Sequence, residues 1–238
     1  MRVAFGLLLL STMLLSACSS VMSRKYEYEE EVFLALDRSA TVNVNASVPA
    51  LVALRGLDLP VDPNARLDLQ KVRGFYETPV TRVASVTSSR RDGRRYVHLR
   101  IEVANIQRLS EAAPFSWSAT AFIPRSDGII FYAHRWNLPA GEDVGDVGWN
   151  GTERVAFRLH IPSRVTFHDS PSGIERGNIL VWEQLLTDRL KNVVLAGQVR
   201  MESESILNRT LSLFAAMMAA VVVTFAAAIW FVKTRKVG

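Results

Sequence analysis

The sequence has a single cysteine, Cys18, in 238 residues. An intramolecular disulfide is therefore excluded, and the fold must depend on its core. The histidines stand singly, without the HxH or HExxH spacing that a zinc site needs, at His98, His134, His160 and His168. A phosphate-binding loop, a nucleophile elbow and a dinucleotide fingerprint are also missing. We therefore expect no metal site, no dissociable cofactor and no catalytic residue, as in a protein that is not an enzyme.

Two loops and one strand carry polar residues that could suggest chemistry. The stretch HDSPSG at 168–173 holds His, Asp and Ser side by side, but catalytic partners usually come from separate elements and meet in space. The stretch GEDVGDVGWNG at 141–151 lacks the residue order and the final bidentate Glu of a calcium loop. We expect the glutamates of the first strand on an exposed face, at Glu27, Glu29, Glu30 and Glu31.

The excess of positive charge lies at the two ends of the chain. The formal net charge is +5, but between positions 19 and 210 there are 24 basic residues against 23 acidic ones. The middle of the chain is therefore almost neutral, and overall basicity does not support nucleic acid as a partner.

The N-terminus has the three parts of a secretory signal. Arg2 is followed by an apolar run at 3–15 and by small residues that end at Cys18. The stretch Leu15-Ser16-Ala17-Cys18 resembles a bacterial lipobox, in which small residues fit a signal peptidase and the thiol accepts a diacylglycerol. We therefore predict that residues 1–17 are cleaved, that Cys18 carries covalent acyl lipid such as palmitate, and that residues 18–24 form a lipidated linker.

A second membrane-length segment lies near the other end of the chain. Residues 211–232 are 22 uncharged residues, enough for a helix of about 33 Å that spans a bilayer core. The positive-inside bias places the tail 233–238 in the cytoplasm through three basic residues, Lys233, Arg235 and Lys236. We expect a single-pass protein of the cytoplasmic (inner) membrane with its folded domain on the periplasmic or extracellular side.

About 190 residues between these segments predict one α+β domain at 25–201, followed by a juxtamembrane linker at 202–210. Alternating strands and hairpin turns near 37–39, 91–94 and 125–128 favour a curved antiparallel sheet. Ser47 as N-cap, an early Pro49 and Gly56 as a stop predict a short helix, and a second helix is expected at 67–76. The stretch NILVWEQLLTDRLKN at 178–192 is expected to run from a strand into a helix. We predict two or three helices on one face of the sheet; a β-sandwich is the alternative.

Four features together resemble the LppM-type bacterial lipoproteins. They are the lipobox, the strand pair KYEYEEEVFLALDRSATVNVN, the segment GNILVWEQ, and the single C-terminal span with its short basic tail. The resemblance implies a domain similar to lipid-binding folds, with a part in envelope lipid traffic or surface properties and no established catalysis. It does not cover the hairpins at 91–94 and 125–128.

Two hypotheses about function follow. In the first, the domain is held close to the outer leaflet and binds an apolar or lipid ligand in cell-envelope lipid handling. In the second, it is an envelope assembly or scaffold protein that docks a protein partner. An apolar cavity would favour the first, whereas a filled core with an exposed apolar patch would favour the second.

Overall fold

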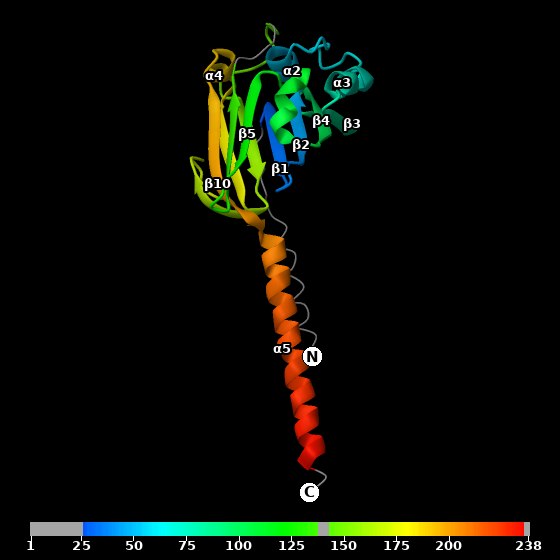
Figure 1. Cartoon of the computed structure of the whole chain (residues 1–238). Helices are drawn as coiled ribbons and strands as arrows, with labels where there is room; N and C mark the ends of the chain where they lie inside the picture. The colour runs from blue at the N-terminus through cyan, green and yellow to red at the C-terminus, as the bar shows by residue number, and fades with distance from the viewer. Residues whose placement is uncertain (1–25, 138–142, 236–238) are drawn as a thin grey trace, which may run out of the picture.

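The computed structural model describes residues 26–137 and 143–235. Within these residues the chain forms two β-sheets, a few short helices and one long C-terminal helix (Figure 1). This confirms the predicted α+β class. Sheet A has six strands in the order β3-β4-β2-β1-β7-β9, and sheet B has four in the order β5-β6-β10-β8.

The strands of sheet A are β1 (Tyr28–Leu34), β2 (Ala40–Ser47), β3 (Thr81–Arg91), β4 (Arg94–Val103), β7 (Arg154–His160) and β9 (Ile179–Leu185). Those of sheet B are β5 (Ser118–Pro124), β6 (Ile129–Trp136), β8 (Ser163–His168) and β10 (Leu195–Ser205). The helices are α2 (Val48–Arg55), α3 (Leu69–Tyr76), α4 (Leu186–Leu190) and α5 (Ile206–Arg235), with 3₁₀ turns η2 (Ile106–Glu111) and η3 (Ala113–Phe115).

The hairpin signals paired neighbouring strands correctly, but they did not show how the pairs are joined. The chain leaves sheet A after β4, builds the β5–β6 hairpin of sheet B, and returns to sheet A with β7. There β7 pairs in parallel with β1, so the sheet is mixed. The strands thus form two sheets where a single curved one was expected, because the crossovers depend on contacts between distant segments.

The core lies between the inner faces of the two sheets. The ring of Tyr28 on β1 lies edge-on to that of Trp136 on β6, with 5.7 Å between the centroids. His134 stacks on Phe157 of β7 at 4.2 Å. Aromatic side chains from both sheets therefore fill the space between them.

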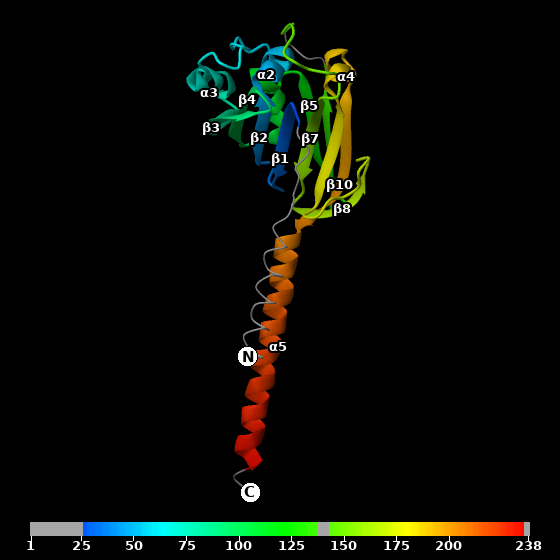
Figure 2. The ribbon, with the colours of Figure 1, turned by 180° about the vertical axis from the view of Figure 1, so that it is seen from behind.

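The helix predicted from Ser47, Pro49 and Gly56 is α2. The Ser47 hydroxyl accepts a hydrogen bond from the backbone N–H of Ala50, and Gly56 ends the helix with a φ of 65°. The short helices α2, α3 and α4 lie toward the end of the domain that is far from α5 (Figures 1 and 2). The predicted second helix is α3, and the strand followed by a helix after 179 is β9 and α4.

Strand β10 continues into α5 without an intervening segment. The strand ends at Ser205 and the helix begins at Ile206, whose N–H donates to the carbonyl of Pro162 at 3.1 Å. Arg209, one turn into the helix, lies 3.7 Å from the Glu202 carboxylate. Residues 202–210, which were expected to form a linker, are thus the end of the strand and the start of the helix.

Among the described residues, α5 is the one helix that is long and apolar enough to cross a membrane. The candidate span runs over Arg209–Phe231, and its side chains are exposed in the structure. The helix points away from the sheets, with the β1–β2 hairpin at the end of the domain nearest to it (Figures 1 and 2).

Candidate binding surfaces

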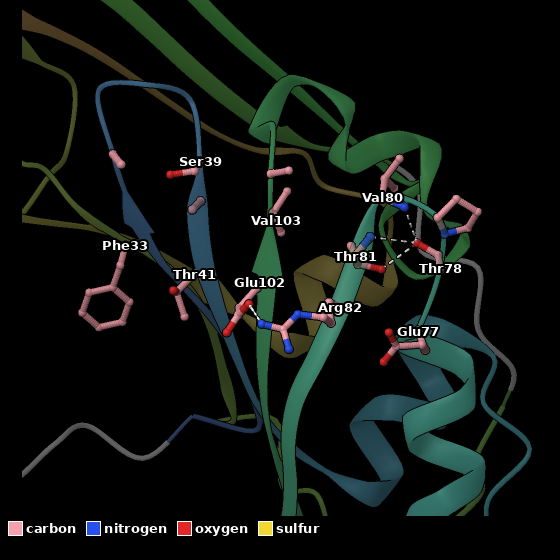
Figure 3. Close-up of a pocket in the computed structure, with 14 residues that line it drawn as sticks. Phe33, Ser39, Thr41, Glu77, Thr78, Val80, Thr81, Arg82, Glu102 and Val103 are labelled. Carbon is pink, nitrogen blue, oxygen red and sulfur yellow. Dashed lines mark hydrogen bonds and ion pairs between the residues drawn. The ribbon is translucent and has the colours of Figure 1, made fainter.

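An open groove lies at the end of sheet A. It has a volume of about 670 Å³ and lies between the β1–β2 hairpin and the connection from α3 to β3. Phe33 and Thr41 line one side, and Thr78, Val80 and Thr81 line the other (Figure 3). The β1–β2 hairpin, which lies at the end of the domain near α5, therefore forms one wall of the groove.

Most polar groups in this groove already have partners inside the protein. Arg82 is paired with Glu102, and Glu77 accepts a hydrogen bond from the backbone N–H of Val83 at 2.9 Å. The hydroxyls of Thr78 and Thr81 lie 2.6 Å apart and bond to each other. What the groove still offers to a ligand is mainly apolar surface.

That apolar surface comes chiefly from one exposed ring. Phe33 is 39% exposed and stacks on His160 with 3.9 Å between the ring centroids. Smaller apolar groups complete the lining, namely Ala35, Ala40, Pro79, Val80, Val103 and Ala104. The charged groups at the rim are two carboxylates and one guanidinium, so the groove is not suited to an anion.

The outer face of sheet A is polar and internally satisfied. A row of side chains crosses five strands, joined by hydrogen bonds, through Ser89, His98, Asn45, Glu29 and Arg158. His160 bonds to Glu31 at 2.7 Å in a neighbouring row. His98 and His160 lie on this polar face.

The outer face of sheet B has a different character. The strand registers place one row across all four strands, through Ile123, Phe131, Arg200 and Phe167. Ile123 is 48% exposed and Phe167 is 46% exposed. The Arg200 guanidinium lies 5.3 Å from the centre of the Phe167 ring. This sheet therefore presents an apolar row with one cation within it.

A buried ionic cluster joins the two sheets in the interior. Glu30 on β1 is fully buried and pairs with Arg55 of α2 at 2.6 Å. The other oxygen of Glu30 accepts from the indole N–H of Trp136 at 3.1 Å. The Arg55 guanidinium lies 3.3 Å from the centre of the Trp117 ring, and Tyr28 bonds to both charged groups. The two sheets and α2 thus meet at a single carboxylate.

Burial controls the protonation of these groups. It raises the pKa of Glu30, although the neighbouring Arg55 charge opposes that shift. It also lowers the pKa of His134 to about 3, helped by the charge of Arg55. His134 is therefore neutral at physiological pH. The buried Arg189 donates to the carbonyls of Trp136 and Val193, and burial together with Arg55 lowers its pKa to about 10.

The glutamates of the first strand are not all on an exposed face, and that expectation was wrong. Glu30 is fully buried and Glu27 nearly so, while Glu29 and Glu31 are half-buried. Glu27 accepts from Arg94 at 2.6 Å and from the Tyr96 hydroxyl at 2.8 Å. Glu30 is in phase with Tyr28 and Val32, and that phase was the signal for its burial.

The membrane-related predictions fall largely at the ends of the chain. The lipobox residues Leu15, Ser16 and Ala17, together with Cys18, lie outside the described residues, as does Lys236. Lys233 is exposed near the end of α5, and Arg235 is the last residue of that helix. Two of the three topology residues thus follow the candidate span directly.

The two loops considered for chemistry have structural roles. Asp169 accepts from the Trp182 indole and from the backbone N–H of Gln198, each at 2.8 Å. Asp143 and Asp146 each accept from the backbone N–H two residues further on. These carboxylates therefore hold their own turns and neighbouring strands.

Comparison of the chain with family models, with curated proteins and with solved structures found no match. The resemblance to LppM-type lipoproteins therefore stays a prediction from the sequence. The groove, the two outer faces and α5 are the features of the structure that bear on function.

Proposed function

We propose that the chain is a single-pass membrane protein whose α+β domain binds a lipid or another amphipathic ligand of the cell envelope in the groove beside Phe33. In this proposal α5 crosses the cytoplasmic membrane, the domain lies on the extracytoplasmic side, and acyl chains on Cys18 provide a second attachment. The protein acts by binding, without catalysis.

The position and lining of the groove support this proposal. Its volume of about 670 Å³ is within the range of about 300–1,000 Å³ that ligand pockets occupy. Most of the polar side chains that line it already have hydrogen-bond or ion-pair partners within the protein, so an apolar chain could contact Phe33 and Val80 without breaking those interactions. The β1–β2 hairpin, which forms one wall, lies at the end of the domain near α5.

The direct junction of β10 and α5 adds to this argument. The candidate span starts at Arg209, only four positions after Ser205 at the end of the strand. At about 1.5 Å per helical residue, that distance is roughly 6 Å. The hairpin end of the domain would therefore lie close to the lipid headgroups, where a lipid can enter the groove without crossing water.

Binding of a fluorescent phosphatidylcholine to the full-length protein in detergent tests the proposal. A zwitterionic lipid is the appropriate probe because the charged rim of the groove does not favour an anion. Phe33→Ser should weaken binding about tenfold or more, since a buried phenylalanine contributes on that scale. Phe167→Ser is the matched control, because Phe167 is similarly exposed but lies on sheet B.

Equal binding by the two variants would contradict the proposal, as would a wild-type protein that binds no lipid. Circular dichroism of each variant shows whether the fold is kept. Native mass spectrometry of the wild-type protein, extracted from its own membrane, would identify a lipid that remains bound.

A second candidate function is assembly with another protein. Two observations favour it: the space between the sheets is filled by aromatic side chains, and the outer face of sheet B exposes an apolar row. In this role the chain would be an envelope scaffold or assembly protein. The two functions are compatible, because they use different surfaces.

A further inference from the structure

We propose that the outer face of sheet B is the contact between two copies of this chain in the same membrane. The inference does not rest on a ligand in the groove, and loss of lipid binding would leave it unaffected. It makes the second candidate function specific by naming a second copy as the occupant of the face.

Apolar residues on the outer face of sheet B favour contact with a partner. An antiparallel sheet that buries one face usually has polar residues on the other. The outward positions of β5 are all apolar, at Ala119, Ala121 and Ile123. On β6 the outward residues are apolar except for the last, at Ile129, Phe131, Ala133 and Arg135. The outward positions of these two strands are thus apolar apart from Arg135, whereas β10 adds Gln198, Arg200 and Glu202 to the same face.

The membrane helix restricts how two copies can meet. Because β10 runs directly into α5, the strands of sheet B point along the helix (Figures 1 and 2). Two copies inserted in the same orientation can be related by a two-fold axis only if that axis runs along the membrane normal. Such an axis lies parallel to the strands, so the two sheets face one another with their strand order reversed.

Reversal of the strand order makes the row complementary to itself. The row reads Ile123, Phe131, Arg200, Phe167 from β5 to β8. In the second copy it reads in the opposite direction, so Ile123 faces Phe167 and Phe131 faces Arg200. The cation is therefore placed over an aromatic ring, which attracts it, and does not face its own copy.

The same reversal also fits two rows further along the strands, beyond the row of Ala133 and Gln198. Arg135 on β6 is paired in register with Ala119 and with Ala196 of β10. In the two-fold arrangement Arg135 faces Ala196 of the second copy, where a small side chain leaves room for the long one. Arg200 and Arg135 thus each meet a residue that can accommodate them.

Thiol cross-linking between two differently tagged full-length chains tests the arrangement. One chain carries Ile123→Cys and the other Phe167→Cys, and both are expressed together in the membrane. A short bis-maleimide should join this mixed pair several times more efficiently than two copies of either single variant. Two copies of residue 123 would lie at opposite ends of the row, three strand spacings or roughly 14 Å apart along the sheet.

The chain without an added cysteine controls for reaction at Cys18. Cross-linking that is equally efficient for mixed and identical pairs overturns the proposed arrangement. A product formed only with a different protein overturns the assignment of a second copy.

A charge reversal provides an independent measurement. Arg200→Glu should lower the dimer fraction of the full-length protein in detergent several-fold, as measured by mass photometry, because a carboxylate is repelled by the face of Phe131. Arg100→Glu is the matched control, since Arg100 is exposed on the outer face of sheet A. A wild-type protein that is monomeric both in detergent and in native-membrane particles overturns the proposal, as does an equal loss in both variants.

Discussion

The outer faces of the two sheets differ, although the inner faces of both are buried against each other. On sheet A, each polar side chain of the row from Ser89 to Arg158 bonds to a neighbour on the next strand. On sheet B, the corresponding row contains Ile123, Phe131 and Phe167. A face whose polar groups bond to one another is stable when it is exposed to water. Covering an apolar face removes it from water and so lowers the free energy.

The two rows are expected to contribute to different properties, the row of sheet A to stability and the row of sheet B to association. The polar row of sheet A consists of contacts within one chain, so its residues should matter for unfolding. The apolar row of sheet B has half-exposed side chains with few contacts to lose within the chain. Substitutions of its residues should weaken the association of two copies and should change the stability of a single copy little.

The largest effect is expected where the two sheets share one interaction. Arg55→Met would leave the Glu30 carboxylate buried without its cation, at a cost of about 3–5 kcal/mol in the free energy of unfolding. Urea unfolding of the full-length protein in detergent, followed by tryptophan fluorescence, measures this. Arg82→Met is the control on sheet A, because its pair with Glu102 is largely exposed and should contribute less than about 1 kcal/mol.

The double variant Arg55→Met with Glu30→Met should recover much of that loss, since it removes both charges. Similar costs for Arg55→Met and Arg82→Met would show that the interior cluster does not hold the sheets together.

A smaller effect is expected at Gly197, where the backbone of sheet B packs against a tryptophan of sheet A. A Cβ atom at Gly197 of sheet B would lie 2.4 Å from the Trp182 ring of sheet A, so Gly197→Ala should cost about 1–3 kcal/mol. Thermal unfolding measures the change. Gly74→Ala should have the opposite sign, because this position in α3 has open space around it and alanine is the better helix former by about 1 kcal/mol. A stable Gly197→Ala protein would indicate that the sheets can separate slightly.

Acid should weaken the packing between the sheets through His134. The pKa of His134 is about 3 in the folded protein, against an ordinary value of 6.5, because burial and the charge of Arg55 disfavour its protonation. The unfolded chain therefore binds one more proton between these two values, and stability is lost as the pH falls below about 6.5. The loss at pH 5 would be at most about 2 kcal/mol.

Urea unfolding at pH 7.5 and at pH 5 measures that difference. His134→Phe keeps a ring next to Phe157. In this variant the free energy of unfolding should differ less between pH 7.5 and pH 5, by up to about 2 kcal/mol, the amount that protonation of His134 contributes. An unchanged difference would show that other groups cause the acid sensitivity.

The smallest effect compares the two outer faces directly. Asn45→Ala on sheet A removes the bonds from Asn45 to Glu29 and with His98, and should cost about 1 kcal/mol. Ile123→Ala on sheet B should change the stability of a single copy by no more than about 0.5 kcal/mol. Thermal unfolding at low protein concentration keeps association out of the measurement. Equal changes in stability at both positions would show that the outer faces of the two sheets do not differ in their contribution to stability.

Local signals predicted the elements that depend on neighbouring residues. The N-cap Ser47 and the stop at Gly56 bound α2 because a helix end is satisfied by groups within a few positions. The hairpin at 91–94 followed in the same way from its turn residues. The signals for Glu30 conflicted: its phase placed it with Tyr28 and Val32, while its charge placed it at the surface. The phase was correct, because Arg55, 25 residues later, neutralises the charge.

The candidate surfaces depended on distant segments and could not be predicted. The groove combines residues near 33–41, 77–82 and 102–104, which sheet register and α3 bring together. The apolar row of sheet B takes one residue from each of four strands between 123 and 200. Along β5 one set of alternate positions holds Ser118, Thr120 and Phe122 and the other holds Ala119, Ala121 and Ile123, and only the pairing of the sheets decides that the second set is left outside.

The sequence by itself determined the class of fold, the short helix after Ser47, the hairpins and a C-terminal helix long enough to cross a membrane. These depend on composition and on interactions over a few residues. Only the tertiary structure decided that the strands form two sheets, that Glu30 is buried between them, and that the domain joins α5 without a linker. Such features depend on which distant segments gain most by burying their apolar faces together, and no local pattern encodes that choice.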